Sequence, residues 1–274
     1  MTSLDSLGTA GWLLVALVGI LGLAVGSFLN VVVWRVPLGQ SVAHPPSACP
    51  RCGHAIRARD NVPVLSWLLL RGRCRDCQEP IAVRYPIVEL VTGALFVLVV
   101  LRFGLASAFV WALPAFLYLA AIAVALALID LDTHRLPNPL VLPAYPVSLV
   151  LLALASAGTD DWWAMARAAI GGASMFAFYL VLALAVPRGM GFGDVKLSGV
   201  LGLYLGWLGW GSLAVGAFSA FLLGGGYAIG LMVFRKVDRR SGIPFGPWML
   251  GGAAIGTFFG DRIATVYLAF VGLN

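Results

Sequence analysis

The sequence has few charged residues, very few lysines and only four cysteines. Charged side chains make up 11% of its 274 residues, whereas an ordinary soluble domain carries about 25%. Hydrophobic side chains make up 61%, against about 45–50% in such a domain. This composition excludes an ordinary soluble enzyme and predicts a polytopic membrane protein.

Lysine is scarce even among the basic residues, since 16 of the 18 are arginine and the formal net charge is +6. These residues collect in short segments between apolar runs, which is the pattern that sets membrane topology. We therefore expect membrane lipid, and no nucleic acid, as the partner of the basic residues. Residues 1–10 contain no Lys or Arg, so the apolar stretch 12–34 lacks the basic region of a signal peptide and is predicted to be a retained first helix.

Apolar stretches recur along the chain at lengths that can cross a bilayer, for which a helix needs roughly 20 residues. They predict an all-α polytopic membrane protein with about eight transmembrane helices and one small soluble loop domain at residues 35–85. The sixth stretch is short, and the eighth is interrupted by Asp261 and Arg262. The expected spans are 11–34, 86–103, 107–130, 138–157, 163–187, 195–209, 211–234 and 247–270.

The distribution of positive charge predicts the orientation of these spans. Segments 35–85, 131–137, 188–196 and 235–246 hold 15 of the 18 basic residues. Because positive segments stay in the cytoplasm, we expect cytoplasmic loops and an N-terminus on the outer side of the membrane. Glycines four residues apart in two spans, Gly22 with Gly26 and Gly226 with Gly230, predict close packing of helices.

The soluble loop contains two cysteine pairs with the spacing of a metal site. Cys49 and Cys52 form the first pair, and Cys74 and Cys77 follow after 21 intervening residues. Two such pairs predict a structural zinc ion held by four cysteines. The alternatives are two disulfides or a redox pair, which a cytoplasmic location disfavours. His44 and His54 lie nearby but are interpreted as surface residues.

Two acids stand at the ends of apolar spans, where an acid is costly and usually functional. Asp130 ends the third span, and Asp194 follows alternating glycines before the sixth. The helix dipole favours a proton on the first and negative charge on the second, as a pair of acids that activates water would require. Asp132 is the rival of Asp130, and both acids have a non-catalytic interpretation as topological charges or helix caps. The glycines lack the preceding strand of a nucleotide-binding loop.

Several motifs in order make the chain resemble the type IV prepilin peptidases, which are bifunctional leader peptidases and N-methyltransferases. The resemblance covers nearly the whole chain. Its marks are Gly26 to Pro37, the cysteine pairs, Asp60 to Trp67, Arg84 to Gly93, Ile129-Asp130 with Leu136-Pro-Asn138, Gly191 to Lys196, and Ile243 to Pro247.

The resemblance implies a membrane aspartic protease of the Gly-x-Gly-Asp type with Asp130 and Asp194 as its active-site pair. It also implies a bacterial inner-membrane location, prepilin or pseudopilin substrates, and S-adenosylmethionine as methyl donor. The methyltransferase is expected in the region 1–103 and the peptidase in 104–274. Glu89 is a weak candidate for pairing with the cationic amine or sulfonium.

A transporter or channel whose aspartates relay ions is the competing hypothesis. The internal repeat typical of transporters is absent from the sequence.

Overall fold

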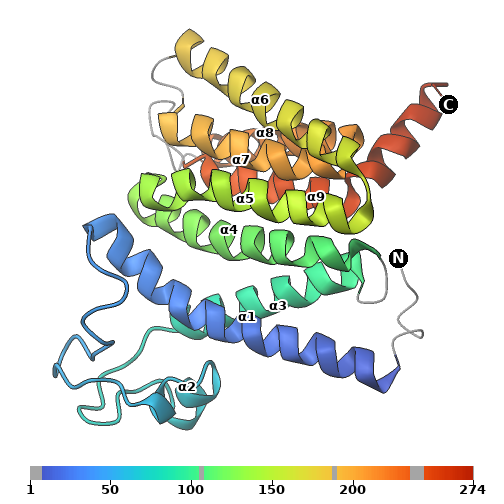
Figure 1. Ribbon diagram of the computed structural model, residues 1–274. Coiled ribbons are helices and arrows are strands. Elements are labelled where there is room, and N and C mark those ends of the chain that lie inside the picture. Colours follow the sequence, from blue (N-terminus) through green and yellow to red (C-terminus); the bar gives the residue numbers. More distant parts are fainter. Residues whose placement is uncertain (1–7, 105–107, 187–189, 235–243, 274) are drawn as a thin grey trace. The chain divides into compact units, whose positions relative to one another are not determined.

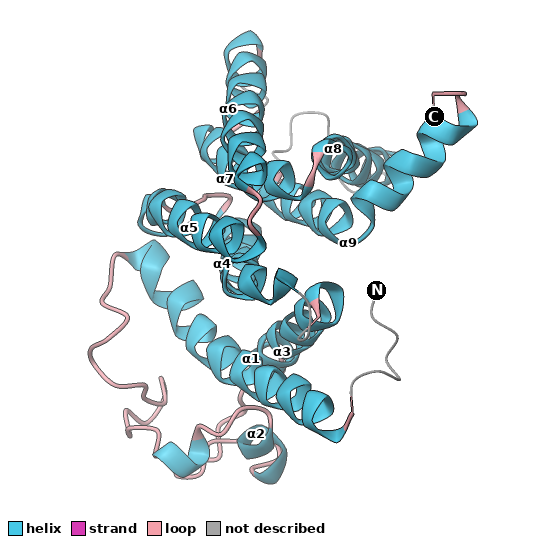
Figure 2. Ribbon diagram, turned by 45° about the vertical axis from the view of Figure 1, so that its right-hand side comes forward, coloured by secondary structure: helices cyan, strands magenta, loops and turns pink. Residues whose placement is uncertain are grey.

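The computed structural model describes residues 8–104, 108–186, 190–234 and 244–273. In these residues the secondary structure is helical, apart from two isolated bridges between single residues (Figures 1 and 2). The predicted all-α class is therefore confirmed. The chain divides into two compact units, Met1–Ala125 and Leu126–Asn274, and the division falls inside one long helix.

The helices follow the predicted spans closely, with short 3-10 turns between some of them. Their bounds are α1 Thr9–Arg35, η2 Val36–Leu38, η3 Ala58–Asp60, α2 Leu65–Leu69, α3 Arg84–Phe103, η4 Ala108–Ala112, α4 Leu113–Thr133, α5 Asn138–Thr159, α6 Trp162–Ala185, α7 Phe192–Leu208, α8 Trp210–Val233 and α9 Gly246–Phe270.

In the first unit, α1 packs against α3 through small residues. A Cβ atom added to Gly22 would lie 2.8 Å from the Gly93 Cα, and one added to Gly26 would lie 2.7 Å from the Glu89 Cα. Only glycine permits the two backbones to approach so closely, as expected for helices packed in lipid. The predicted packing role of Gly22 and Gly26 is confirmed.

In the second unit, α7 is the central helix and contacts α5, α6, α8 and α9. The two views agree in placing it among these four helices (Figures 1 and 2). Thirteen of its 17 residues are buried. Since α7 has almost no exposed face, any polar group on it is enclosed by protein.

The antiparallel pair α6–α7 is held at very short range by glycines. A Cβ at Gly171 would lie 2.6 Å from the Gly202 carbonyl oxygen and 3.0 Å from the Gly206 Cα. One turn further along α6, the Ser198 hydroxyl, which donates to the Val195 carbonyl oxygen of its own helix at 2.7 Å, also contacts the Met175 carbonyl oxygen at 3.3 Å. These contacts fix the register of the pair.

Helices α8 and α9 form the second close pair, again through glycines. A Cβ at Gly252 would lie 2.6 Å from the Gly216 carbonyl oxygen, and one at Gly260 would lie 2.5 Å from the Ser212 Cα. Gly226 and Gly230, on the opposite part of α8, meet no atom within 4 Å. The close packing predicted for these two glycines is therefore wrong within the part of the chain that the structure describes.

Six helical segments in the described residues are long and apolar enough to cross a membrane, which supports a multi-pass membrane protein. The predicted count of eight is not confirmed. Helix α7 has 17 residues, fewer than the roughly 20 that a span requires. Helix α9 runs unbroken through Asp261 and Arg262, which lower its hydropathy. The six segments are Thr9–Leu38, Arg84–Phe103, Ala108–Thr133, Asn138–Thr159, Trp162–Ala185 and Trp210–Val233.

Candidate functional site

Asp130 lies near the C-terminal end of α4, buried within the second unit. Asp130 is 4% exposed, and its Oδ2 accepts a hydrogen bond from the backbone N–H of Gly246 at 3.0 Å. Helix α4 continues past it to Thr133, so that Asp132 points elsewhere and is exposed. Of the two rival acids, the structure therefore encloses Asp130.

Asp194 lies in the first turn of α7, as expected for an acid that complements the positive end of a helix dipole. Gly191 is the N-cap residue, and its backbone N–H donates to the Asp194 Oδ2 at 3.1 Å. The residue is 8% exposed. Both acids are thus buried, and each accepts one backbone hydrogen bond.

The backbone segments that support the two acids both contact one residue, Leu136. Leu136 lies between their supporting segments. A Cβ at Gly193 would lie 3.0 Å from the Leu136 Cβ, and one at Gly246 would lie 3.4 Å from its Cδ2. Two buried carboxylates at short range tend to share one proton, because both cannot remain charged. Such a pair contains an acid and a base, as needed to activate a water molecule.

Lys196 is bound on the surface beside this site rather than reaching into it. Its Nζ donates to the Asn138 Oδ1 at 2.9 Å and lies 4.9 Å from the centre of the Phe192 ring. Its backbone carbonyl accepts a 2.6 Å hydrogen bond from the Tyr145 hydroxyl. Together, these contacts join the start of α7 to α5.

Two residues of the site were missed by the sequence reasoning. Gly246, whose N–H binds Asp130, lies in the motif Ile243 to Pro247 that was noted without a role. A Cβ there would lie 2.7 Å from the Asp130 Oδ2, which explains the glycine. The other is Tyr179, which the antiparallel register of α6 and α7 places at the level of Asp194. No motif marked it, because the contact depends on the register of two helices.

The four cysteines of the first unit converge in one cluster. Their sulfur atoms lie within 4.8 Å of one another, and the Sγ atoms of Cys49 and Cys77 are 3.7 Å apart. Four sulfurs bound tetrahedrally at about 2.3 Å from one ion would lie about 3.8 Å apart. All four are free thiols, so the alternative of two disulfides is not found. The cluster can hold a metal ion.

The two cysteine pairs adopt the same turn, which presents their sulfurs to one point. The N–H of Cys49 donates to the His54 carbonyl at 3.0 Å, and the N–H of Cys74 donates to the Glu79 carbonyl at 2.8 Å. Each turn ends with a positive φ, at Gly53 and Gln78. The matched geometry indicates a single site built from two equivalent halves, whereas His44 and His54 contribute no ligand to the cluster.

The thiols differ in how readily they ionise. Backbone N–H groups of Cys52 and Arg51 lower the pKa of the Cys49 thiol to about 7. The N–H of Glu79 acts in the same sense on Cys77, but burial and the other three sulfurs raise the pKa of that thiol to about 12. Since a metal binds thiolates, a cation at the centre would be needed to ionise all four together.

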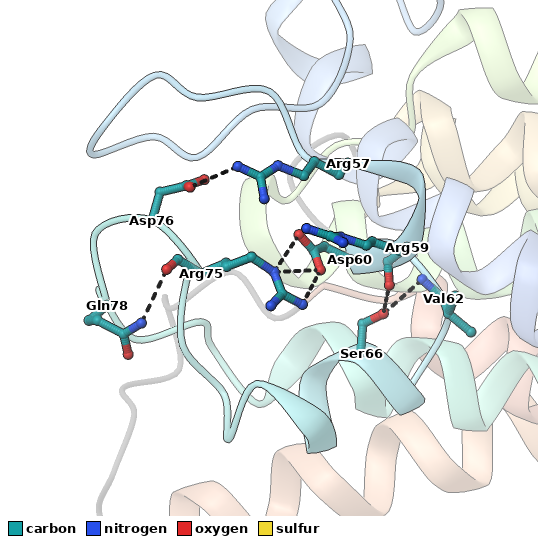
Figure 3. A network of polar contacts seen from close by, with 8 residues as sticks. All are labelled: Arg57, Arg59, Asp60, Val62, Ser66, Arg75, Asp76 and Gln78. Atoms are coloured by element: carbon teal, nitrogen blue, oxygen red, sulfur yellow. Dashed lines mark hydrogen bonds and ion pairs between the residues drawn. The ribbon is translucent and has the colours of Figure 1, made fainter.

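Ion pairs connect the turn of the second cysteine pair to η3 and to the residue before it (Figure 3). Arg57 contacts Asp76 at 3.2 Å. Arg75 donates to Asp60 through Nε at 3.0 Å and through Nη2 at 2.6 Å. The Asp60 side chain is 8% exposed, and hydrogen bonds from Arg75 lower the pKa of its carboxyl group. Bidentate contacts of this kind fix geometry as well as charge.

Glu89 is buried on α3 at 8% exposure. Its Oε2 accepts a 2.7 Å hydrogen bond from the backbone N–H of Val64, which precedes α2. The carboxylate therefore ties the soluble loop to the helix pair α1–α3. It lies in the first unit, whereas Asp130 and Asp194 lie in the second.

Comparison with known proteins gives a consistent result for both units. Residues 20–103 match the Bacterial Peptidase A24 N-terminal domain, and residues 116–229 match the Type IV leader peptidase family. Relatives named "Prepilin leader peptidase/N-methyltransferase" include one from Aeromonas hydrophila, 38% identical over 94% of each chain. One from Pseudomonas aeruginosa is 36% identical over 93% of each chain. One from Burkholderia pseudomallei is 39% identical over 88% of this chain and 84% of its own. No solved structure matches the chain.

Proposed function

The chain belongs to the type IV leader peptidase family, and on this basis we propose that it cleaves the leader peptide of type IV prepilins or pseudopilins and then methylates the new N-terminal residue. The relatives named for both activities cover nearly the whole chain. The single observation in the structure that carries the peptidase activity is the buried pair of acids, each bonded to one backbone N–H.

The proposed catalytic residues are Asp130 and Asp194. In the proposed reaction, Asp194 takes a proton from a water molecule, whose oxygen then bonds to the scissile carbonyl carbon. Asp130 starts protonated and donates a hydrogen bond to the carbonyl oxygen, and the peptide C–N bond breaks as its nitrogen receives the proton that Asp194 took from the water, which returns both acids to their starting states. The position of each acid on its helix supports these roles, because the start of α7 favours negative charge and the end of α4 favours a proton.

The methyl transfer is assigned to the first unit, with S-adenosylmethionine as the donor. This assignment is supported by the match of residues 20–103 to the N-terminal domain of the family. The donor supplies an electrophilic methyl group when it is bound. Glu89 is the proposed partner for the positive charge of the amine or sulfonium, since it is a buried carboxylate of that unit. Its bond to Val64 would hold it in place.

The proposed metal is a structural zinc ion bound by Cys49, Cys52, Cys74 and Cys77. Zinc is supported by the four-sulfur donor set and by the spacing of the sulfur atoms, which suit a closed tetrahedral site. A closed site leaves no position for substrate, so the ion would stabilise the loop. A loop of this size buries little apolar surface and needs such a cross-link.

We place the protein in the bacterial inner membrane, with its N-terminus in the periplasm and its acids near the cytoplasmic boundary. The concentration of basic residues in segments 35–85, 131–137, 188–196 and 235–246 supports this orientation. The basic leader of a prepilin would then stay in the cytoplasm while its apolar helix enters the membrane. Lipid is the remaining partner, and no nucleic acid is involved.

The test uses purified protein, a prepilin and S-adenosylmethionine, with cleavage and methylation followed by mass spectrometry. Asp130→Asn and Asp194→Asn should each abolish cleavage while melting like the wild type. Asp132→Asn is the matched control, because it changes an exposed acid two residues away, and it should retain cleavage. Full cleavage by either of the first two variants would refute the proposed pair.

A further inference from the structure

Tyr179 on α6 has an unusual environment for a tyrosine. It is 0% exposed, and its hydroxyl oxygen is buried without a hydrogen-bond partner in the part of the chain that the structure describes. Buried hydroxyl groups nearly always have a partner, because leaving one unpaired costs stability. A phenylalanine would fill the same space without this cost, so the hydroxyl requires another explanation.

The register of α6 and α7 places Tyr179 opposite Asp194. Gly171 meets Gly202, and four residues further along α6, Met175 accepts a hydrogen bond from Ser198, which is four residues earlier on α7. In an antiparallel pair, the next turn brings Tyr179 to the level of Asp194. The electrostatic interaction between the Tyr179 hydroxyl and the Asp194 carboxylate agrees with this placement.

The tyrosine ring is held by aromatic neighbours from two other elements. Its centroid lies 5.5 Å from that of Phe221 on α8 and 6.3 Å from that of Phe245, just before α9. Phe245 directly precedes Gly246, whose N–H binds Asp130. The ring therefore packs against α8 and against the residue next to the support of Asp130, and these contacts hold the ring in place.

We propose that Tyr179 is a further catalytic residue, whose hydroxyl group binds the attacking water molecule together with Asp194. This inference rests on the proposed peptidase function. The hydroxyl group lies at the level of the carboxylate along the helix pair and has no hydrogen bond to it, which is an arrangement that a bridging water satisfies. The tyrosine keeps its proton throughout. The water proton passes to Asp194, and the water oxygen bonds to the scissile carbonyl carbon.

A second buried tyrosine provides a matched control. Tyr204 on α7 is also 0% exposed, but its hydroxyl accepts a 3.0 Å hydrogen bond from Ser148 and lies almost three helical turns beyond Asp194. Tyr179→Phe and Tyr204→Phe each remove one buried oxygen atom. They differ in whether that oxygen has a protein partner and in whether it lies beside the acids.

The experiment measures kcat and KM for prepilin cleavage, together with the melting temperature, for both variants and for Asp194→Asn. For Tyr179→Phe we expect kcat to fall about tenfold to hundredfold, the effect of one lost hydrogen bond in the transition state, with KM unchanged and no loss of melting temperature. For Tyr204→Phe we expect a lower melting temperature with kcat unchanged. Methyl transfer to an already cleaved pilin should be normal in both, which shows that the first unit is intact, while the melting temperature reports on the second unit, where both tyrosines lie.

The outcomes separate this inference from the proposed function. If Asp194→Asn is inactive and Tyr179→Phe cleaves with the kcat of the wild type, Tyr179 has no catalytic role and the peptidase function stands. An equal loss of kcat in Tyr204→Phe would also overturn the inference, because the effect would then be one of packing. If Asp194→Asn retains full activity, the proposed active site itself is wrong.

Discussion

Replacing Gly202 with alanine tests whether the close contact of α6 and α7 maintains the candidate active site. The added Cβ would lie 2.8 Å from the Gly171 carbonyl carbon and 2.9 Å from the Gly172 Cα, whereas ordinary contacts begin at 3.4 Å. These are backbone atoms, which cannot rotate away as a side chain does. The two helices must therefore separate by more than about 0.6 Å, because the added Cβ would lie nearer still to the Gly171 carbonyl oxygen.

The loss of stability caused by this separation is measured against a control variant in another apolar helix. Overpacking of this kind costs about 1–3 kcal/mol. Gly226→Ala is the control, because a Cβ there meets nothing within 4 Å and gains the same helix propensity, up to about 1 kcal/mol. The difference in unfolding free energy between the two variants should thus be about 1–3 kcal/mol.

The assay combines thermal melting with cleavage of a prepilin. Each kcal/mol shifts the melting temperature of a protein of this size by about 2–4 °C, so Gly202→Ala should melt between about 2 and about 12 °C below Gly226→Ala. Cleavage should also fall by about tenfold, since a displacement of about 1 Å can cost about a hundredfold in rate. Gly226→Ala should cleave like the wild type.

The reasoning would be refuted if the two alanine variants melted together and cleaved equally. That result would mean that the helices tolerate the added methyl group and that their spacing does not position Asp194. A loss of stability without a loss of cleavage would refute the second part alone.

Three further predictions concern single contacts. Gly246→Ala should slow cleavage at least tenfold with little change in melting, since its Cβ would lie 2.7 Å from the Asp130 Oδ2; cleavage at the normal rate would contradict this. Asp60→Asn should loosen the cysteine loop, measured by hydrogen exchange. The difference in hydrogen exchange between this variant and the wild type should be fully present above about pH 3.9, the pKa of Asp60 in the unfolded chain. It should vanish as the pH falls through the folded-state pKa of Asp60, which the hydrogen bond from Arg75 lowers. A difference that grows on acidification would contradict this prediction. Cys77→Ser should reduce bound zinc below about one ion per chain, and elemental analysis that finds no zinc in the wild type would overturn the metal assignment.

The sequence predicted the helical class and most helix positions because apolar runs long enough to cross a bilayer are a strong signal. The span expected at 11–34 is the helix Thr9–Arg35, and the span expected at 138–157 is the helix Asn138–Thr159, despite Pro143 and Pro146 within it. The predicted number of spans exceeds the six found in the described residues, because the prediction treated every apolar helix as a span. Helix α7 is apolar because it is enclosed by protein.

The candidate site was predictable where local chemistry marks it. Asp130, Asp194 and the four cysteines stand out by charge in an apolar context or by spacing. The choice between Asp130 and Asp132 depended on which side of α4 faces the interior, and a single helix does not reveal this. The partner of Asp130, Gly246, lies 116 residues away in sequence, and Tyr179 meets Asp194 only through tertiary register. Contacts between residues so far apart in the sequence cannot be predicted from the local sequence pattern around either residue.

The glycine-lined contact between α6 and α7 also makes axial sliding a hazard for the site. Helix surfaces usually lock together because ridges of side chains fill grooves, but at Gly171 and Gly202 the surfaces are nearly smooth. A slip by one turn, about 5.4 Å, would keep small residues in contact and still carry Asp194 away from Asp130. Polar bonds that act along the axis must therefore prevent it. The 2.6 Å bond from Tyr145 to the Lys196 carbonyl is placed to hold α7, and the longer contact of Ser198 with the Met175 carbonyl adds to it.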